Sequence, residues 1–476
     1  MAYAEKRGNL WRARWRGPDG TLESKPGFQS RKAAEDYGRD QEAAIRSNTY
    51  VDARSGRITL TDWVNQWFPA LDLEPTTIDS YRYMIEVNIL PAFGDRTLVS
   101  LSQEEIAAWE ASLVSNGLSR RTAREARSTL TNVLADAIPR HIQTNPAARK
   151  RGKGRKGQRR IERLERQQKA WATPLQALLI AERAAVLSGL TTDFVMVLTL
   201  AYTGMRWSEV IGLPPECVRD DAVDVHWKLY ELNGRFYRGR PKDGSMRTAD
   251  IPPFLRQLLT DHLDTDQTRK CSCRYIKKQG DTIPWCSGDE YVFLGPKLSH
   301  FRRSNYSARI MRPASDGRYP GYEGNSPRPA MPVLVDMSRL WPGKPLPPRP
   351  PVIPGQPYQA PSGRGIRRLP EDMPLASWLP VLADLTPHGL RHGHQTWMDE
   401  VNISYVLQSE RMGHEVPGMR GIYSHVSPRM RATLVDDLQD MWETSLAERA
   451  RLSPRSAVGA LDAILSRPHG HRVGVG

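Results

Sequence analysis

The stretch TPHGLRH at residues 386–392 places a histidine and an arginine, His388 and Arg391, three positions apart. Side chains with this spacing lie on one face of a helix. An isolated His-x-x-Arg pair is usually a surface pair, so its meaning depends on what the rest of the chain offers. Three further segments carry polar groups that fit the same chemistry.

The first of these segments, TGMRWSE at residues 203–209, places Arg206 at the start of a predicted helix, with Glu209 near enough to orient it. The second, GRPKDGSMRT at residues 239–248, puts Lys242 on a predicted turn between strands. The third combines MGH at residues 412–414 with GIYSH at residues 421–425. Arginine, lysine, histidine and tyrosine together can bind and attack a phosphodiester.

In this order the motifs resemble those of the tyrosine recombinase, or phage integrase, family: TGxR, a hairpin lysine, HxLRH, a GH pair and a spaced YSH. The resemblance extends from about residue 59 to the end, apart from an insertion, and residues 1–50 look like the arm-site binding module of some integrases. Small departures are Met412, where leucine is frequent, and Trp207, where a smaller residue is common. The long insertion before His388 is the main departure.

The resemblance implies that Arg206 and Arg391 clamp the non-bridging oxygens of the reacting phosphate, with His414 as a third donor. Permanently charged, forked guanidinium groups suit this task. His425 is an alternative for the role of His414, and His392 matches a structural histidine. An ion pair with Glu209 at a helix start is the alternative interpretation of Arg206.

By the same resemblance, Tyr423 is the nucleophile, His388 assists it as a base, and Lys242 protonates the leaving 5′-hydroxyl. The product is a 3′-phosphotyrosine link, which conserves bond energy, so that religation needs neither ATP nor metal. The sequence accordingly contains no Gly-Lys-Ser/Thr phosphate loop and no acidic metal cluster. Alternatives to Lys242 are the other basic residues near the turn, which are Lys228, Arg240 and Arg247.

Composition agrees with an anionic partner. The 476 residues include 68 Lys or Arg and 53 Asp or Glu, which gives a formal charge of +15 and a pI near 9.7. Neutralised phosphates release counterions, so such a balance favours nucleic acid, although a merely basic soluble protein also fits. No apolar run has membrane-spanning length, no signal peptide is recognisable, and the four cysteines make no disulfide scaffold. We expect a cytoplasmic, nucleoid-associated protein without membrane contact.

The length predicts several domains. The local patterns and the family resemblance imply that these domains are mainly α with small β-sheets (α+β). The expected order is an arm-type DNA-binding module (1–50), a helical SAM-like core-binding domain (59–147), a basic linker (148–172), a mixed α/β catalytic domain (173–450) and a flexible tail (451–476). Prolines at residues 347–351 favour an irregular insertion over about 313–384. Strands are expected over 223–230 and 235–237, around Asn233-Gly234.

Basic residues gather in three of these segments. In the N-terminal strand, arginines alternate with Trp11, Ala13 and Trp15, which predicts one apolar and one basic face. A second group opens a helix after Ser119, and a third lies in the stretch 149–166, which has ten basic and two acidic residues and a net charge of +8. The predicted DNA-binding residues are Arg12, Arg14, Arg16, Arg120, Arg121, Arg124, Lys150, Arg151 and Lys153. Solvated faces are the alternative for all three groups.

The cysteines leave two interpretations open. Cys271, Cys273 and Cys286, with His300 beyond, can bind zinc, but their spacing is irregular. Free thiols are the simpler interpretation, and the predicted reaction requires no cofactor.

The resulting prediction is an integrase of a phage or integrative plasmid that integrates, and also excises, a mobile element. Its expected partners are double-stranded attachment-site DNA, three further copies in a tetrameric synapse, an excisionase and a DNA-bending host protein. Alternatives are a type IB topoisomerase, a catalytically inactive DNA-binding regulator and a chromosome-dimer resolvase. The intact set of basic residues and Tyr423 argues against an inactive regulator.

Overall fold

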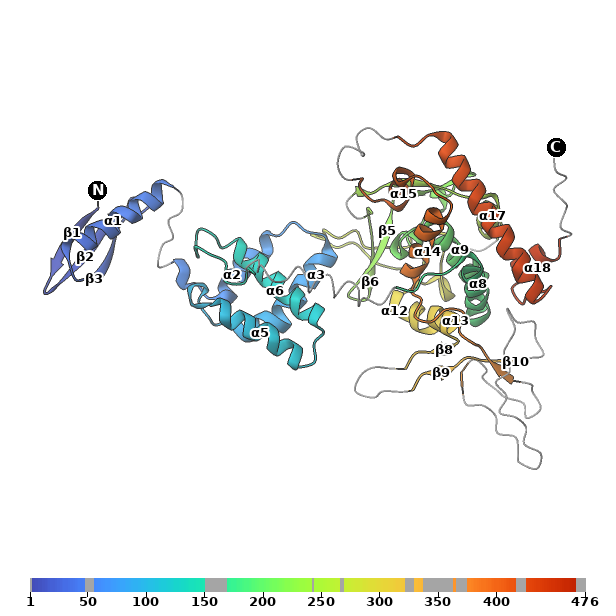
Figure 1. The fold of residues 1–476 in the computed structure, drawn as a ribbon, viewed down its shortest axis with the longest axis horizontal. Helices are drawn as coiled ribbons and strands as arrows, with labels where there is room; N and C mark the ends of the chain where they lie inside the picture. Colours follow the sequence, from blue (N-terminus) through green and yellow to red (C-terminus); the bar gives the residue numbers. More distant parts are fainter. Residues whose placement is uncertain are drawn as a thin grey trace, which may run out of the picture. The chain divides into compact units, whose positions relative to one another are not determined.

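The computed structural model describes residues 2–47, 55–149, 169–241, 244–265, 269–321, 329–336, 363–364, 375–416 and 425–467. The chain divides into two compact units, Met1–Glu165 and Arg166–Gly476 (Figure 1). Five predicted site residues lie outside the described ranges: Lys150, Arg151, Lys153, Lys242 and Tyr423. The predicted mainly helical fold class with small sheets is confirmed.

The N-terminal module is a three-stranded antiparallel sheet, β1 (Tyr3–Arg7), β2 (Leu10–Arg16) and β3 (Leu22–Phe28), followed by α1 (Arg31–Arg46). The predicted alternation in β2 holds, because Ala13 and Trp15 are buried while the arginines lie on the other face. Trp15 meets Tyr37 of α1 edge to face, with ring centroids 5.7 Å apart. Aromatic packing of this kind fixes the helix on one face of the sheet.

The second part of the first unit is a helical bundle. Its helices are α2 (Leu60–Trp67), α3 (Pro75–Tyr83), a π-helical turn (Met84–Ile89), α4 (Leu90–Phe93), α5 (Gln103–Ser115) and α6 (Arg120–Ala135). A capping box formed by Ser102 and Glu105 starts α5, and Ser119 caps α6. Trp63 donates from its indole N–H to the carbonyl of Val133, 2.9 Å away, which ties α2 to α6 in the core.

Helices form the core of the second unit. They are α8 (Pro174–Ser188), α9 (Thr191–Thr203), α10 (Trp207–Val210), α11 (Pro253–Leu263), α12 (Arg303–Tyr306), α13 (Arg312–Asp316), α14 (Pro387–Glu400), α15 (Tyr405–Met412), α17 (Pro428–Leu452) and α18 (Gly459–Leu465). A π-helical turn (Ser307–Met311) joins α12 to α13. Every residue of α9 from Asp193 to Thr203 is buried, so this helix is the centre of the unit. No helix in the described ranges is long and apolar enough to cross a membrane.

The sheets of the second unit are two-stranded and antiparallel. β5 (Lys228–Leu232) pairs with β6 (Arg235–Gly239) across the predicted turn at Asn233-Gly234. The expected strand over 223–230 is wrong in one respect: β4 (Ala222–Val225) ends before β5 and pairs instead with β7 (Arg247–Asp250). The β5–β6 hairpin is therefore inserted between two strands that pair with each other.

Parts of the predicted insertion are more regular than expected. The short pairs β8 (Arg318–Tyr319) with β9 (Met331–Pro332), and β10 (Leu334–Asp336) with β11 (Leu375–Ser377), frame it. Val333 and Trp378 are buried between these strands, because apolar side chains in the insertion still reach the body of the unit. The proline run at 347–351 lies outside the described residues.

The predicted flexible tail from residue 451 differs from the structure over 451–467. Helix α17 extends to Leu452, and α18 follows it. Val458 and Leu461 are buried in the main core, and Arg455 forms an ion pair with Asp462 at 2.7 Å. Burial of apolar side chains thus stabilises a folded structure in this segment, despite its prolines and serines.

A buried ion pair joins the first and last long helices of the second unit. Arg449 of α17 donates from Nε and Nη2 to the two carboxylate oxygens of Glu182 in α8, both at 2.6 Å. Neither side chain is exposed. The hydroxyl of Ser456 donates to the same carboxylate at 2.5 Å, so three hydrogen bonds stabilise the buried negative charge of Glu182.

Candidate active site

The turn that positions Arg206 requires glycine. Gly204 ends α9 with φ +65°, a left-handed conformation that favours glycine. A Cβ atom there would lie 2.7 Å from His394 Cδ2 and 2.8 Å from Met412 Sδ. Any other residue at position 204 would strain the backbone and clash where α9 packs against α14 and α15, which explains the glycine of the TG pair in the sequence motif.

Arg206 begins α10 and is held by Glu209. Its backbone N–H donates to Oε2 of Glu209 at 2.7 Å, and its Nη1 donates to Oε1 at 2.8 Å. The arginine side chain is 26% exposed, while that of Glu209 is 1% exposed. Among the described residues no acceptor contacts Nη2 of Arg206, which leaves N–H donors for a ligand.

Glu209 also binds a second arginine, Arg247 at the start of β7. Nη2 of Arg247 donates to Oε2 at 2.8 Å, and Nη1 donates to Oε1 at 3.2 Å. Burial disfavours the charged carboxylate, but hydrogen bonds and positive charge from Arg247, followed by Arg206, hold the pKa of Glu209 below its usual value. One carboxylate thus orients two guanidinium groups.

Arg391 enters the same place from α14. The residue is buried, and its Nη1 donates to the carbonyl of Gly204 at 2.6 Å. Nη2 donates to the carbonyl of Met412 and to Nε2 of His414, the latter at 3.1 Å. Burial and then the charges of Arg206 and Arg247 lower the pKa of Arg391 to about 9, so it stays charged near neutral pH.

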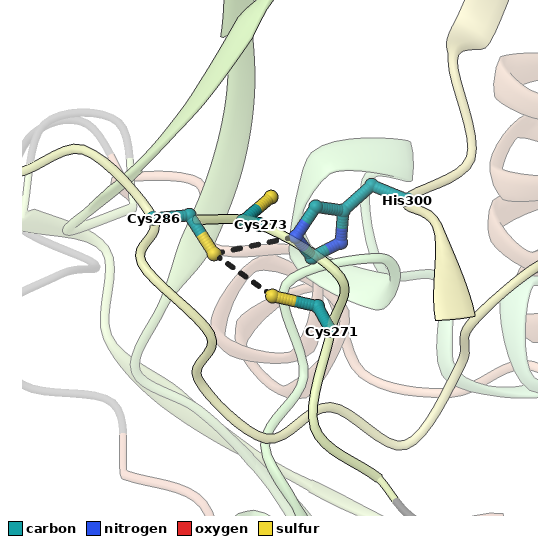
Figure 2. A group of neighbouring side chains, drawn as sticks. All are labelled: Cys271, Cys273, Cys286 and His300. Atoms are coloured by element: carbon teal, nitrogen blue, oxygen red, sulfur yellow. Dashed lines mark hydrogen bonds between the residues drawn. The ribbon is translucent and has the colours of Figure 1, made fainter. Parts of the chain in front are cut away.

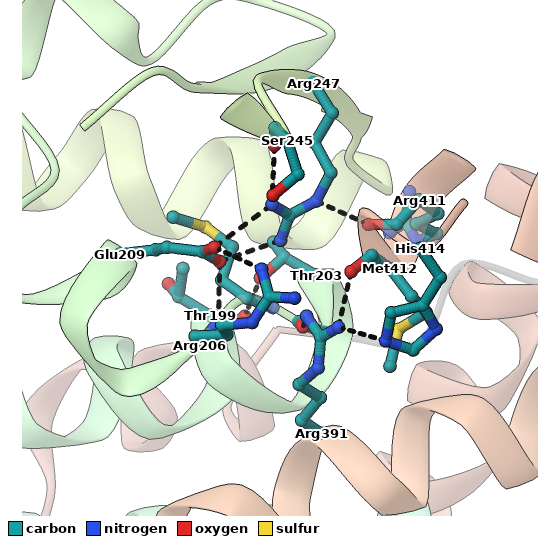
Figure 3. A network of polar contacts seen from close by, with 12 residues as sticks. Thr199, Thr203, Arg206, Glu209, Ser245, Arg247, Arg391, Arg411, Met412 and His414 are labelled. Carbon is teal, nitrogen blue, oxygen red and sulfur yellow. Dashed lines mark hydrogen bonds and ion pairs between the residues drawn. The ribbon is translucent and has the colours of Figure 1, made fainter. Parts of the chain in front are cut away.

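His414 follows α15 and contributes an imidazole to this group. Burial and the charges of the three arginines lower its pKa. Because Nε2 accepts a hydrogen bond from Arg391, the proton of the neutral ring lies on Nδ1, which can donate to a ligand. Figure 3 shows the arginine side chains converging from three elements, with His414 beside them.

The net positive charge of this arginine cluster favours binding of an anion. Glu209 binds the guanidinium groups of Arg206 and Arg247, and the charge of Arg391 lies close enough to interact with all three. Among the described residues the positive charges of this cluster therefore outnumber its negative charge. The excess positive charge is concentrated in a largely buried place, where charges interact more strongly than in water. An anion with several oxygens, such as a phosphate diester, would neutralise it.

A second layer of buried groups fixes the cluster. Arg247 donates from Nε to the carbonyl of Arg411 at 2.7 Å. The guanidinium of Arg411 is fully buried and donates to Nε2 of His394 at 2.8 Å and to the carbonyls of Asp250 and Tyr202. The sequence motifs did not indicate these roles for Arg247, Arg411 and His394. The position of Arg247 at the start of the strand after the lysine turn was the one available signal.

His388 shares α14 with Arg391 but lies in a different environment. Its side chain is exposed, and its ring packs edge to face on that of His392, with centroids 4.5 Å apart. Desolvation by the surrounding protein, and then the charges of His392 and Arg391, lower its pKa to about 4. The ring is therefore neutral and able to accept a proton at neutral pH.

The remaining predicted site residues do not belong to the arginine cluster or lie outside the described ranges. Arg16, Arg120, Arg121 and Arg124 are exposed, whereas Arg12 and Arg14 are half-buried and Arg14 donates to Glu5 at 2.7 Å. Lys242 lies outside the described residues between β6 and β7, and Tyr423 lies outside them between His414 and α17. His425, the alternative to His414, is exposed, and among the described residues no hydrogen bond joins it to the arginine cluster.

Comparison with known proteins defines the class of fold. Residues 59–114 match the family model described as "Phage integrase, N-terminal SAM-like domain". The Tn1549 transposon integrase, solved with circular intermediate DNA, is 14% identical, with 80% of this chain and 99% of that chain covered at a TM-score of 0.50. A lambda integrase dimer bound to a COC' core site is 16% identical, with 91% and 97% covered at a TM-score of 0.41. No curated protein matches in sequence.

The chain therefore has the fold of a tyrosine-recombinase integrase. Within it, segment 59–114 is similar to the N-terminal SAM-like domain of phage integrases.

Proposed function

We propose that this protein is a site-specific DNA recombinase that cuts and rejoins DNA through a 3′-phosphotyrosine intermediate. The observation that carries the proposal is the convergence of Arg206, Arg391 and His414 around an excess of positive charge. These are the residues that the sequence motifs single out, and their donors suit one phosphate group.

The arginines bind the scissile phosphate and stabilise its transition state. Negative charge builds on the non-bridging oxygens as the nucleophile attacks. Donors already held in place by Glu209, Gly204 and Met412 need not reorganise at that moment. A single preorganised donor of this kind contributes about 2.7–4 kcal/mol in measured oxyanion sites.

Tyr423 supplies the nucleophile in this proposal. Its hydroxyl oxygen attacks phosphorus. Because the pKa of a phenol is near ~10, the hydroxyl is protonated at neutral pH, and its proton must be removed during the attack. His388 accepts that proton, which its low pKa of about 4 allows by keeping the ring neutral. Binding of the DNA phosphate brings negative charge near the ring and raises its basicity.

Lys242 donates a proton to the leaving 5′-oxygen. The bond from phosphorus to that oxygen breaks as the phosphotyrosine bond forms, so the number of phosphoester bonds is unchanged. Religation is the same step in reverse, with a 5′-hydroxyl of the same or another duplex as the nucleophile. Strand exchange between duplexes then integrates, and in reverse excises, a mobile element.

DNA contacts outside the site come from the first unit. We assign phosphate contacts to Arg120, Arg121 and Arg124, which lie in the first turns of α6, and to the outer face of β2. Lys150, Arg151 and Lys153 extend the basic surface in the linker. A tetramer on two duplexes, with an excisionase and a DNA-bending host protein to set direction, completes the proposed assembly.

The test uses nicked duplexes in which loss of a short fragment blocks religation. They are prepared from the DNA flanking the gene and from a random-sequence pool, and incubated with wild type, Tyr423→Phe and Tyr405→Phe. Tyr405 is 52% exposed on α15 and serves as the matched control. A covalent protein–DNA band is expected with wild type and with Tyr405→Phe, and not with Tyr423→Phe.

Other outcomes separate the alternatives. Equal bands in all three proteins would mean that another residue attacks. Tight binding without any band would favour a DNA-binding regulator. Relaxation of supercoiled DNA of any sequence, without joining of two duplexes, would favour a type IB topoisomerase.

A further inference from the structure

Three cysteines and a histidine converge in the second unit, away from the arginine cluster. The Sγ atoms of Cys271, Cys273 and Cys286 and a ring nitrogen of His300 all lie within 4.8 Å of one another (Figure 2). Cys271, Cys286 and His300 are buried, and Cys273 is half-buried. The first and last ligands, Cys271 and His300, are 29 positions apart in the chain, so folding is required to bring them together.

The spacing of these atoms matches a tetrahedral metal site. Sγ of Cys286 lies 3.3 Å from Sγ of Cys271 and 3.3 Å from Nε2 of His300. A zinc ion with bonds of about 2.3 Å to sulfur would hold its sulfur ligands about 3.8 Å apart. The four atoms therefore need only small movements to surround one ion. A disulfide bond is shorter, at about 2.05 Å, and would leave Cys273 and His300 without a role.

The donor set selects the kind of metal. Three thiolates and an imidazole are soft or borderline ligands, which suit zinc, whereas magnesium and calcium require oxygen. Four protein ligands close the coordination sphere, which is typical of structural and not catalytic zinc.

The surroundings support the ligands. The His300 ring lies between Tyr291 and Phe236, with centroid distances of 4.7 and 4.8 Å. The hydroxyl of Tyr291 is 3.4 Å from Sγ of Cys286 and can donate to a thiolate there. Such outer contacts orient metal ligands and stabilise their charge.

The chain around the cluster contains little regular secondary structure. From Arg269 to Arg302, all of it described, the one helical element is the short turn Pro296–Leu298. Its backbone hydrogen bonds include one within the loop, from Cys271 N–H to the carbonyl of Asp289 at 3.0 Å, and one from Cys286 N–H to the carbonyl of Phe236 in β6 at 2.8 Å. A metal bound by residues near both ends of this loop and in its middle would stabilise the folded loop, because the free energy of metal binding adds to the free energy of folding.

We propose that Cys271, Cys273, Cys286 and His300 bind one zinc ion, which fixes residues 269–302 against the β5–β6 hairpin. This structural role does not depend on the proposed recombinase activity. The hairpin is followed in the chain by β7, which begins at Arg247, so the metal supports the scaffold of the arginine cluster from a distance.

The test measures metal content in the full-length chain, purified under reducing conditions without added zinc. We expect about one zinc per chain in wild type and in Cys217→Ser, the matched control, because Cys217 is buried but lies outside the cluster. Cys286→Ser and His300→Ala should lose the zinc, whereas His300→Cys should keep it, since four thiolates also form a zinc site.

Wild-type protein provides a second measurement if the serine variants do not fold. Removal of metal with a chelator should lower the melting temperature, added Zn²⁺ should restore it, and Co²⁺ should give the visible absorption of a tetrahedral thiolate site. The proposal is overturned if reduced wild type contains no zinc and gives no such Co²⁺ spectrum. It is equally overturned if iron is the bound metal, if mass spectrometry finds a Cys271–Cys286 disulfide, or if Cys286→Ser retains the zinc.

Discussion

Arg247 and Glu209 form a forked ion pair, with Nη2 to Oε2 at 2.8 Å, and the same carboxylate carries Arg206 on its other side. Both partners are almost fully buried, at 3% and 1% exposure. Glu209 is thus the shared support of two arginines, one of which faces the proposed phosphate.

Replacing that support should cost stability as well as activity. Glu209→Gln leaves the buried charge of Arg247 without a counter-charge, and breaking such a pair from one side costs about 3–5 kcal/mol. Denaturant unfolding measures the change. Glu216→Gln is the control, because Glu216 is exposed and its contact with Arg238 is long, at 3.7 Å. A loss below about 1 kcal/mol for Glu209→Gln would show that the amide satisfies both arginines.

Arg391→Lys should impair chemistry although the charge is kept. The forked guanidinium of Arg391 reaches Gly204, Met412 and His414 at once, and a single ammonium cannot. The expected loss is about 10²–10³ in single-turnover cleavage, as for removal of one preorganised donor. Arg256→Lys, an exposed change on α11, should cleave normally. Cleavage by Arg391→Lys at the wild-type rate would exclude the proposed clamp.

The role of Lys242 can be tested by changing the leaving atom. With ordinary DNA, Lys242→Ala should slow cleavage by about 10²–10⁴, the usual contribution of general acid catalysis. With sulfur in place of the 5′-oxygen, the leaving thiolate needs no proton, since thiols titrate near ~8.5. The variant should then recover to near wild-type rates. Recovery in Lys228→Ala or Arg240→Ala instead would assign the acid to that residue.

Acid should destabilise the second unit through its buried histidines. Burial, and then the charges of Arg411 and Arg391, hold the pKa of His394 well below 6.5, while burial and Arg269 lower that of His262 to about 4. The unfolded chain therefore binds more protons in acid. Stability is complete above about pH 6.5 and falls as the pH decreases towards these lowered values.

The variant His394→Gln tests this dependence. Its amide oxygen can accept from Arg411 without titrating, so the slope of unfolding free energy against pH below 6.5 should decrease by up to about 1.4 kcal/mol per pH unit. His425→Gln, an exposed change, should leave the slope unaltered. An unchanged slope in His394→Gln would mean that other groups account for the acid sensitivity.

Local sequence patterns predicted most of the helices and strands. The features that they did not predict depend on contacts between residues far apart in the chain. Alternation in β2, the caps at Ser102 and Ser119, and the Asn233-Gly234 turn act within a few residues, so the sequence displays them. The pairing of β4 with β7 depends on closing a loop over the intervening hairpin, which no local pattern encodes.

The same distinction applies to the site. Arg206 and Arg391 stand in recognisable motifs, whereas the role of Arg411 arises from contacts with Tyr202 and Asp250, which are 209 and 161 positions away along the chain. A buried arginine looks like a surface arginine in sequence, because only its folded partners distinguish the two. The proposed zinc ligands were recognisable by residue type, but their irregular spacing in the sequence could not show that the four side chains converge.

The bond between Glu182 and Arg449 has a consequence for synthesis of the protein. Its partners are 267 positions apart, on the first and last long helices of the second unit. At about 5–20 residues per second, a ribosome needs on the order of 13–53 seconds to make the chain between them. During that interval the nascent unit holds an acidic group that its core cannot yet neutralise. Folding of this unit is therefore completed only after Arg449 has been synthesised, and a product truncated before that residue leaves Glu182 without its buried partner.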